Sequence, residues 1–227
     1  MHRIRRFDAM TGYETARTRM VESQLRPNKV TDKRLLDAFL TIHRELFVPE
    51  HLQAVAYVDE ALPLGKGRYV MEPMVAARLL QAAAVERTDT ALIVGAGTGY
   101  EAALVAVLAR SVVALEEDPE LARRAHAALV EHSIASVSLA EAPLPQGHRA
   151  RAPYDVIFFC GAVAEVPAEI ASQLADGGRL MAVVKSGSGM GHATLTTRIG
   201  GGLARRVLFD ATTALLPGFF PKPAFAF

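Results

Sequence analysis

The sequence contains a single cysteine and no tryptophan, and it has almost no excess of either charge. One cysteine, Cys160, can form neither an internal disulfide nor a metal cluster. Lysine plus arginine (25) balance aspartate plus glutamate (24), so a nucleic-acid-binding face is not expected. The longest run without a charge or a strong turn former, around residues 156–164, is roughly half the ~20 residues that a membrane-spanning helix needs. These absences favour a protein of the reducing cytoplasm that binds neither nucleic acid nor membrane.

The 227 residues, 51% hydrophobic and 22% charged, are enough for one α/β domain with a sizeable core. We expect residues 1–9 to be a flexible extension, because no apolar periodicity begins before Tyr13. Residues 10–75 then supply helices and a candidate site loop, and residues 76–227 supply the main ligand-binding part. Apolar spacing predicts helices over 13–25 and 32–43, the second capped by Thr31 or Asp32, and Pro73 opens a third.

From residue 90 onward, short apolar runs alternate with helical stripes, which is typical of a parallel sheet covered on both faces. The predicted strands are 91–94, 111–115, 137–140, 154–159 and 179–185, and the predicted helices are 100–109, 119–132 and 166–175. Residues 192–199 and 205–213, joined by three glycines, predict an antiparallel hairpin at the sheet edge. The expected architecture is a seven-stranded, mostly parallel sheet with an amino-terminal helical extension.

The most informative stretch is an apolar strand that runs into Gly95-Ala96-Gly97-Thr98-Gly99 and then into a helix. Glycines at alternate positions let backbone approach a ligand closely at the carboxyl edge of a sheet. A plain tight turn is the simpler interpretation, but three glycines exceed what a turn needs. The dinucleotide pattern G-x-G-x-x-G requires glycine where Tyr100 stands, and no Gly-Lys-Ser or Gly-Lys-Thr follows as in a phosphate-binding loop. The spacing G-x-G-x-G instead indicates an S-adenosylmethionine site.

A carboxylate is expected at the end of the next strand, where it would accept both ribose hydroxyls. Glu116 ends that strand and is the preferred candidate. Glu117 is the alternative, although it also fits a solvated turn, with Asp118 capping the helix that Pro119 begins.

Several motifs in a fixed order then resemble one family. Residues 20–25 (M-V-E-S-Q-L), 62–67 (L-P-L-G-K-G), 152–155 (A-P-Y-D) and 173–180 (Q-L-A-D-G-G-R-L) are similar to motifs of the protein-L-isoaspartate O-methyltransferases. The resemblance implies a Rossmann-like class I methyltransferase fold and S-adenosyl-L-methionine as cofactor. It further implies methyl transfer to a carboxylate, such as L-isoaspartyl in damaged protein, by a cytoplasmic repair enzyme that is a monomer or a homodimer. The resemblance is weakest in the last forty or so residues.

The site motif departs from the family pattern. Where the family reads Q-T-I-S-x-P, this chain reads Arg68-Tyr69-Val70-Met71-Glu72-Pro73, so Met71 takes the position of a serine implicated in catalysis. Ile93 replaces the usual acidic residue before the glycine loop, and Ala140-Glu141-Ala142 replaces G-D-G. The resemblance still implies that Glu141 takes the adenine amino group, and Cys160 is expected to line the cofactor pocket.

These changes bear on the chemistry of the site. An isoaspartyl carboxylate is already ionised at pH 7, so such an enzyme aligns its nucleophile and need not generate it. Glu72 would repel this acceptor unless Arg68 pairs with one or the other carboxylate, or unless Glu72 only serves the dipole of the following helix.

Two other functional classes stay open. A cofactor-binding homologue without methyl transfer, acting as a sensor or interaction module, is favoured by Met71, Ile93 and Ala140. A dinucleotide oxidoreductase is disfavoured by Tyr100.

Overall fold

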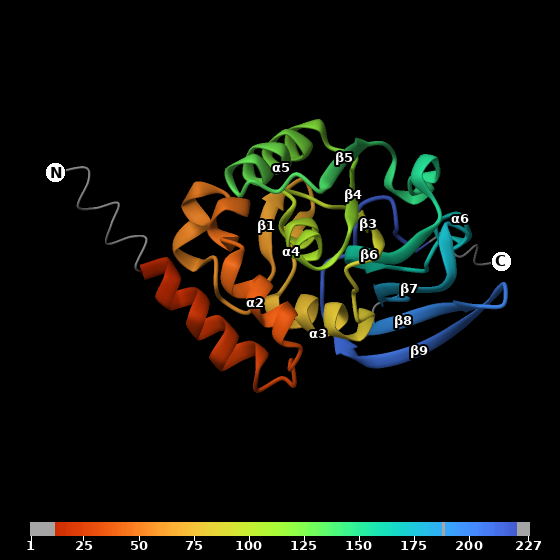
Figure 1. The fold of residues 1–227 in the computed structure, drawn as a ribbon, viewed down its shortest axis with the longest axis horizontal. Helices are drawn as coiled ribbons and strands as arrows, with labels where there is room; N and C mark the ends of the chain where they lie inside the picture. The colour runs from red at the N-terminus through yellow and green to blue at the C-terminus, as the bar shows by residue number, and fades with distance from the viewer. Residues whose placement is uncertain (1–11, 188, 222–227) are drawn as a thin grey trace.

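The fold is described from a computed structural model, which places residues 12–187 and 189–221 (Figure 1). The predicted extension, residues 1–9, lies outside these ranges. The centre of the fold is a seven-stranded sheet with the order β5-β4-β3-β6-β7-β8-β9. The strands are β3 (Thr90–Val94), β4 (Ser111–Glu116), β5 (Val137–Glu141), β6 (Tyr154–Val163), β7 (Leu174–Val184), β8 (Gly191–Ile199) and β9 (Gly202–Ala211). The first five are parallel and the last two form an antiparallel edge hairpin, as the sequence predicts.

The helices gather mainly on one face of the sheet. Residues 12–20 form a helix that continues into η1 (Val21–Leu25), followed by α2 (Lys33–Thr41) and α3 (Pro73–Ala83). These three pack with α4 (Tyr100–Leu108) and α5 (Pro119–Glu131) into one apolar core that includes Ile93 and Phe158 of the sheet (Figure 1). Asp32 caps α2, with its carboxylate accepting from the amides of Arg34 and Leu35. None of the described helices is long and apolar enough to cross a membrane.

The opposite face is covered thinly. Short 3-10 helices η4 (Leu144–Gln146) and η5 (Arg149–Arg151), the four-residue α6 (Ala168–Ala171) and a carboxy-terminal segment lie over it. Leu144 and Ile170 bury against Leu92, Val94 and the rest of a second apolar cluster, and Leu216 and Phe219 complete it. Residues of the carboxy-terminal segment therefore form part of the apolar core on this face.

Two sequence predictions about elements need correction. The helix predicted over 166–175 is only Ala168–Ala171, because β7 already begins at Leu174 and passes through a bulge that contains Gly177 at φ +77°. The edge hairpin turns through Gly200 and Gly201, both with positive φ, and β9 starts at Gly202 rather than at Arg205. Two-residue turns with positive φ at both positions suit the twist of an antiparallel hairpin.

A small two-stranded sheet was missed by the sequence analysis. Two further 3-10 helices, η2 (Arg44–Phe47) and η3 (Glu50–Val55), lead to β1 (Leu62–Gly65), which pairs antiparallel with β2 (Arg68–Val70). Strands of four and three residues are too short to give a clear period in the sequence. This hairpin carries Arg68 to the carboxyl edge of the main sheet, where the predicted site lies.

Candidate functional site

The predicted site residues meet where the strand order of the main sheet reverses. β3 lies between β4, which follows it in the chain, and β6, which comes after β5. The glycine loop follows β3, Glu116 ends β4, and Gly161 lies near the end of β6. In open α/β sheets, ligands bind in the crevice outside the carboxyl ends of the strands at such a reversal.

The backbone of the glycine loop has positive φ angles, which any residue with a Cβ would adopt only with strain. Gly95, Gly97 and Gly99 have φ of +74°, +58° and +94°. The amides of Gly95 and Ala96 both donate to the carbonyl of Leu115 at 3.0 Å, which fixes the loop against the end of β4. The loop is therefore a rigid, close-packed turn that brings the Gly97 amide to Glu116.

Glu116 is completely buried, and both of its carboxylate oxygens are engaged. Oε2 accepts from the amide of Gly97 at 2.6 Å, while Oε1 accepts from the amides of Glu117 and Asp118 at 3.0 Å each. Three backbone donors fix this carboxylate at the carboxyl edge of the sheet. Glu117, the alternative candidate, is exposed. The geometry favours Glu116 for the predicted ligand role.

Arg68 forms an ion pair with Glu116 inside the crevice. Its Nη1 donates to Glu116 Oε1 at 2.6 Å, and the arginine side chain is 3% exposed. Its Nε and Nη2 are buried without a hydrogen-bond partner. The sequence left open whether Arg68 pairs with Glu72 or with an acceptor carboxylate. In the structure Arg68 pairs with Glu116, the predicted ribose ligand.

Met71 lies in the apolar core and is 1% exposed. Its backbone is held on both sides, with the amide donating to Glu101 Oε1 at 3.2 Å and the carbonyl accepting from Arg44 Nη2 at 2.8 Å. The backbone at the serine position of the family is thus fixed by a buried acid and a buried base. Met71 itself offers no polar side-chain group to an acceptor.

Burial raises the pKa of Glu101, while the nearby Arg44 opposes that increase. A carboxyl whose pKa is raised on folding contributes stability that is full below its ordinary value of 4.5 and is lost as pH rises through the raised pKa. We therefore expect the free energy of unfolding to fall less between pH 4.5 and 8 in Glu101→Gln than in the wild type. The glutamine keeps an amide oxygen that can still accept from the Met71 amide. Urea unfolding across this range measures the difference, and parallel curves would contradict a raised pKa.

Glu72 precedes α3 but does not cap it through its side chain. Burial raises the pKa of Glu72, while its own backbone amide and the nearby Thr213 oppose this increase. Its Oε2 is buried without a hydrogen-bond partner. Glu72 thus lies near Thr213, which precedes the carboxy-terminal segment, and it forms neither a salt bridge with Arg68 nor a side-chain cap of α3. Its favourable position at the positive end of the α3 dipole stays a prediction.

The two remaining predicted ligands lie at the margins of the crevice. Cys160 in β6 is buried, and burial together with nearby Glu101 raises the pKa of its thiol well above its ordinary value, so it stays a neutral apolar group. Glu141 ends β5 beside Glu116, and its side chain is exposed. Within residues 12–187 and 189–221, His, Cys, Asp and Glu side chains form no group of three suited to a metal.

Three contributors to the site were not found from the sequence. Lys66 in the β1–β2 turn donates to Asp118 at 2.5 Å and closes the hairpin over the loop after β4. Leu64 of the same hairpin lies over the glycine loop, 2.9 Å from where a Cβ on Gly97 would be. Leu216 packs against Gly95 and Gly161 from the carboxy-terminal segment. Only the L-P-L-G-K-G motif provided a signal, since it marks the hairpin.

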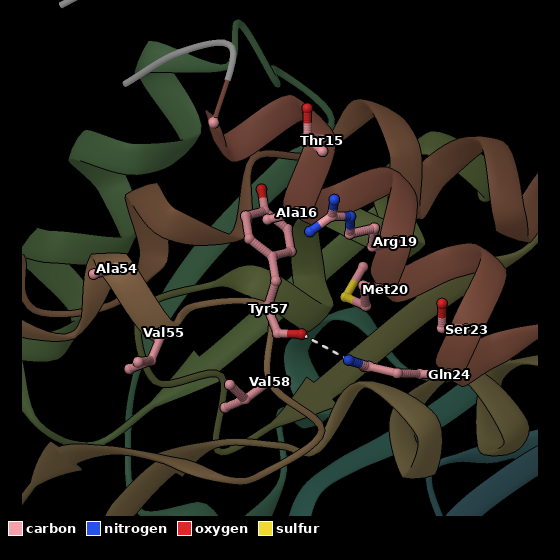
Figure 2. Close-up of a pocket in the computed structure, with 11 residues that line it drawn as sticks. Thr15, Ala16, Arg19, Met20, Ser23, Gln24, Ala54, Val55, Tyr57 and Val58 are labelled. Carbon is pink, nitrogen blue, oxygen red and sulfur yellow. Dashed lines mark hydrogen bonds between the residues drawn. The ribbon is translucent and has the colours of Figure 1, made fainter. Parts of the chain in front are cut away.

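A separate cavity of about 690 Å³ opens between the amino-terminal helix and η3. Figure 2 shows Met20, Gln24 and Tyr57 on its wall, with the Gln24 amide donating to the carbonyl of Tyr57 at 2.9 Å. None of the predicted ligand residues lines this cavity. It is distinct from the crevice at the glycine loop.

Comparison with known proteins identifies the family. The sequence model described as "Protein-L-isoaspartate(D-aspartate) O-methyltransferase (PCMT)" matches residues 15–205. The chain belongs to the protein-L-isoaspartate O-methyltransferase family. A relative of that name from Koribacter versatilis is 37% identical over 201 residues, which cover 88% of this chain and 90% of the relative. Another from Methanoculleus marisnigri is 39% identical over 168 residues, covering 74% and 76% of the two chains.

Solved structures agree with the fold of this family. One protein-L-isoaspartate O-methyltransferase superposes with a TM-score of 0.77 at 24% identity, covering 89% of this chain and 66% of the other. A Plasmodium falciparum structure, described as a putative member in complex with S-adenosyl-L-homocysteine, superposes with a TM-score of 0.76 at 17% identity, covering 90% and 97%. The predicted Rossmann-like methyltransferase fold and the predicted family are confirmed.

Proposed function

We propose that the protein is an S-adenosylmethionine-dependent methyltransferase that transfers a methyl group to a carboxylate, with L-isoaspartyl residues of damaged protein as the candidate acceptor. The observation that carries the proposal is Glu116, a buried carboxylate held by the Gly97 amide at the reversal of strand order in a chain of this family. An ionised carboxylate there can accept both hydroxyls of a ribose. The names of the curated relatives support the reaction class, and the S-adenosyl-L-homocysteine bound in the Plasmodium falciparum structure supports the class of ligand.

The residues around the glycine loop have the chemical groups that this cofactor needs. Glu116 would hold the ribose, the glycine loop allows close approach of backbone, Glu141 lies beside Glu116 on β5 for the adenine, and Cys160 adds apolar wall. The space beside Gly95 is occupied by Arg68 in the structure, since a Cβ on that glycine would lie 2.9 Å from Arg68 Nη2. The site therefore has suitable groups, but binding requires side chains to move.

Methyl transfer to a carboxylate does not require a general acid or base in this site. When bound, S-adenosylmethionine supplies a methyl group on a positively charged sulfur. The acceptor carboxylate is ionised at pH 7, so the chain need not remove a proton from it. The residues instead have to hold the acceptor oxygen in line and keep water out. The β1–β2 hairpin, held to Asp118 by Lys66, lies over the glycine loop and can help to exclude water.

Replacement of Glu116 tests the cofactor site. We expect Glu116→Ala to weaken binding of S-adenosyl-L-homocysteine by roughly 10- to 100-fold, because a charge-assisted contact worth about 1.5–3 kcal/mol is lost. Glu117→Ala is the matched control, since it removes an adjacent but exposed carboxylate. Isothermal titration calorimetry on the three proteins measures the effect. Equal affinity in Glu116→Ala and wild type would refute the ribose assignment.

A second candidate function is a cofactor-binding homologue without methyl transfer, serving as a sensor or interaction module. The position of Met71 favours it, because this side chain is buried in the core at the family's serine position and has no hydroxyl. Labelled methyl transfer to an isoaspartyl peptide separates the two functions. Cofactor binding without transfer to any carboxylate acceptor would favour the second.

The proposal also includes a setting and a partner. The single, buried and free thiol of Cys160 suits the reducing cytoplasm. The partner would be a protein or peptide carboxylate in need of repair, and the working unit a monomer or a homodimer.

A further inference from the structure

The carboxy-terminal segment, residues 214–219, returns from the edge hairpin to the crevice at the centre of the sheet. In Figure 1 the last part of the chain, in dark blue, passes from β9 back to the end of β6, where Leu215 bridges Ala162. The amide of Ala162 donates to Ala214 at 2.8 Å, and the amide of Leu216 donates to Ala162 at 2.8 Å. The segment is therefore attached to β6 by a bridge, beside the glycine loop.

Leu216 fills the space at the reversal of strand order. A Cβ placed on Gly95 would lie 3.0 Å from Leu216 Cδ2, and one placed on Gly161 would lie 2.7 Å from Leu216 Cγ. Leu216 is 3% exposed. Gly95 and Gly161 are thus in contact with a leucine of the same chain, at the sheet edge where ligands of open α/β sheets bind.

Arg68 occupies the other half of the same space. Its guanidinium binds Glu116 and lies against Gly95, so the acceptor of the ribose hydroxyls is already in use. Two of its nitrogens, Nε and Nη2, are buried and unpaired, although buried polar groups are normally hydrogen-bonded. Both carboxylate oxygens of Glu116 thus have hydrogen-bond donors, whereas two of the three guanidinium nitrogens of Arg68 have no acceptor.

We infer that Arg68 and Leu216 compete with the cofactor for the crevice, so that residues 214–219 form a strap that must leave before an adenosyl ligand binds. This inference rests on the proposed function, because it concerns the same site. The strap lies beyond residue 205, where the match to the family model ends, and Arg68 stands where the family motif has glutamine.

The strap is also tied to the rewritten motif. Thr213, just before it, lies close enough to Glu72, the residue that precedes α3, to lower the pKa of that carboxyl. At its other end, the carbonyl of Phe219 accepts from the Ala164 amide at 2.9 Å, and the Phe219 ring packs edge-on against Phe159 at 5.6 Å. These contacts hold Leu216 over the glycine loop in the closed form.

The test compares S-adenosyl-L-homocysteine binding by calorimetry in the wild type, Arg68→Gln, Leu216→Ala and the double variant. We expect each single variant to bind at least tenfold more tightly than the wild type, and the double variant more tightly than either. Leu215→Ala is the matched control. Leu215 is the neighbouring leucine of the same strap, but it packs against the helix-covered core and not against Gly95 or Gly161, so this variant should bind like the wild type. Equal affinity in all five proteins would overturn the strap while leaving the proposed function intact.

Amide hydrogen exchange gives a second readout that does not depend on a change in affinity. Saturating S-adenosyl-L-homocysteine should speed exchange of the wild-type Ala162, Ala164 and Leu216 amides, because their bonds to or from the strap open. Bound ligand with these amides still protected would overturn the inference. If even the double variant binds no ligand, the adenosyl site itself is refuted, and with it both the proposed function and the strap's role.

Discussion

Replacing Arg44 by methionine should cost about 3–5 kcal/mol of stability, a value typical of removing one partner from a buried charged network. Arg44 is fully buried, and it donates from Nε to the carbonyl of Ala56 at 2.7 Å and from Nη2 to that of Met71 at 2.8 Å. Its guanidinium also lies 4.9 Å from the centre of the Tyr100 ring. Arg44→Met fills a similar volume but leaves two buried carbonyls unpaired and removes the cation near Glu101.

Urea unfolding at pH 7 measures this loss. Arg26→Met is the matched control, because Arg26 is exposed and makes a surface ion pair with Glu22, so its replacement should change stability by less than about 0.5 kcal/mol. A loss of under about 1 kcal/mol in Arg44→Met would show that solvent reaches the network. Because Arg44 holds the Met71 carbonyl, the result also bears on how firmly the site motif is fixed.

The sequence predicted the parts of the site that depend on local pattern. The strand before Gly95, the alternation of glycines and the position of Glu116 at the end of the next strand all follow from residues close together in the chain. Parallel strands bring their carboxyl ends to one edge, so the meeting of Gly97 with Glu116 could be anticipated. These features need only the order of the elements and not the details of packing.

The partners of Arg68 and the position of Leu216 could not be predicted in this way. Arg68 reaches Glu116 across 48 residues, through a hairpin too short to show in the sequence. Leu216 comes from a segment in which no motif points to the site. Nothing in the sequence marks Arg44 or Glu101 as buried. Arg44 is buried by contacts with the Tyr100 ring and the Met71 carbonyl, which lie far from it in the chain. These contacts are determined by packing between segments that are far apart in the chain.

The rewritten motif raises the question of which change limits methyl transfer. Arg68→Gln and Met71→Ser restore the family residues at two positions, which removes the ion pair with Glu116 and adds a hydroxyl. Glu72→Gln is added to them because it removes a half-buried carboxylate. We expect the triple variant to methylate an isoaspartyl peptide about 100-fold faster than Arg68→Gln alone, a size typical of one well-placed donor at the reacting group. Labelled methyl transfer under saturating cofactor measures the rates.

Burial of Met71 dictates the control for this experiment. Shortening a fully buried methionine leaves a cavity that commonly costs about 2–5 kcal/mol, so lost stability could mask a gained hydroxyl. The matched protein carries Arg68→Gln, Met71→Ala and Glu72→Gln, which has a closely similar cavity and the same charge but no hydroxyl. A faster rate in the serine protein than in this alanine protein assigns the gain to the hydroxyl. Equal rates in the two would show that the serine is dispensable in this scaffold, and any shared gain over Arg68→Gln would then come from removing the charge of Glu72.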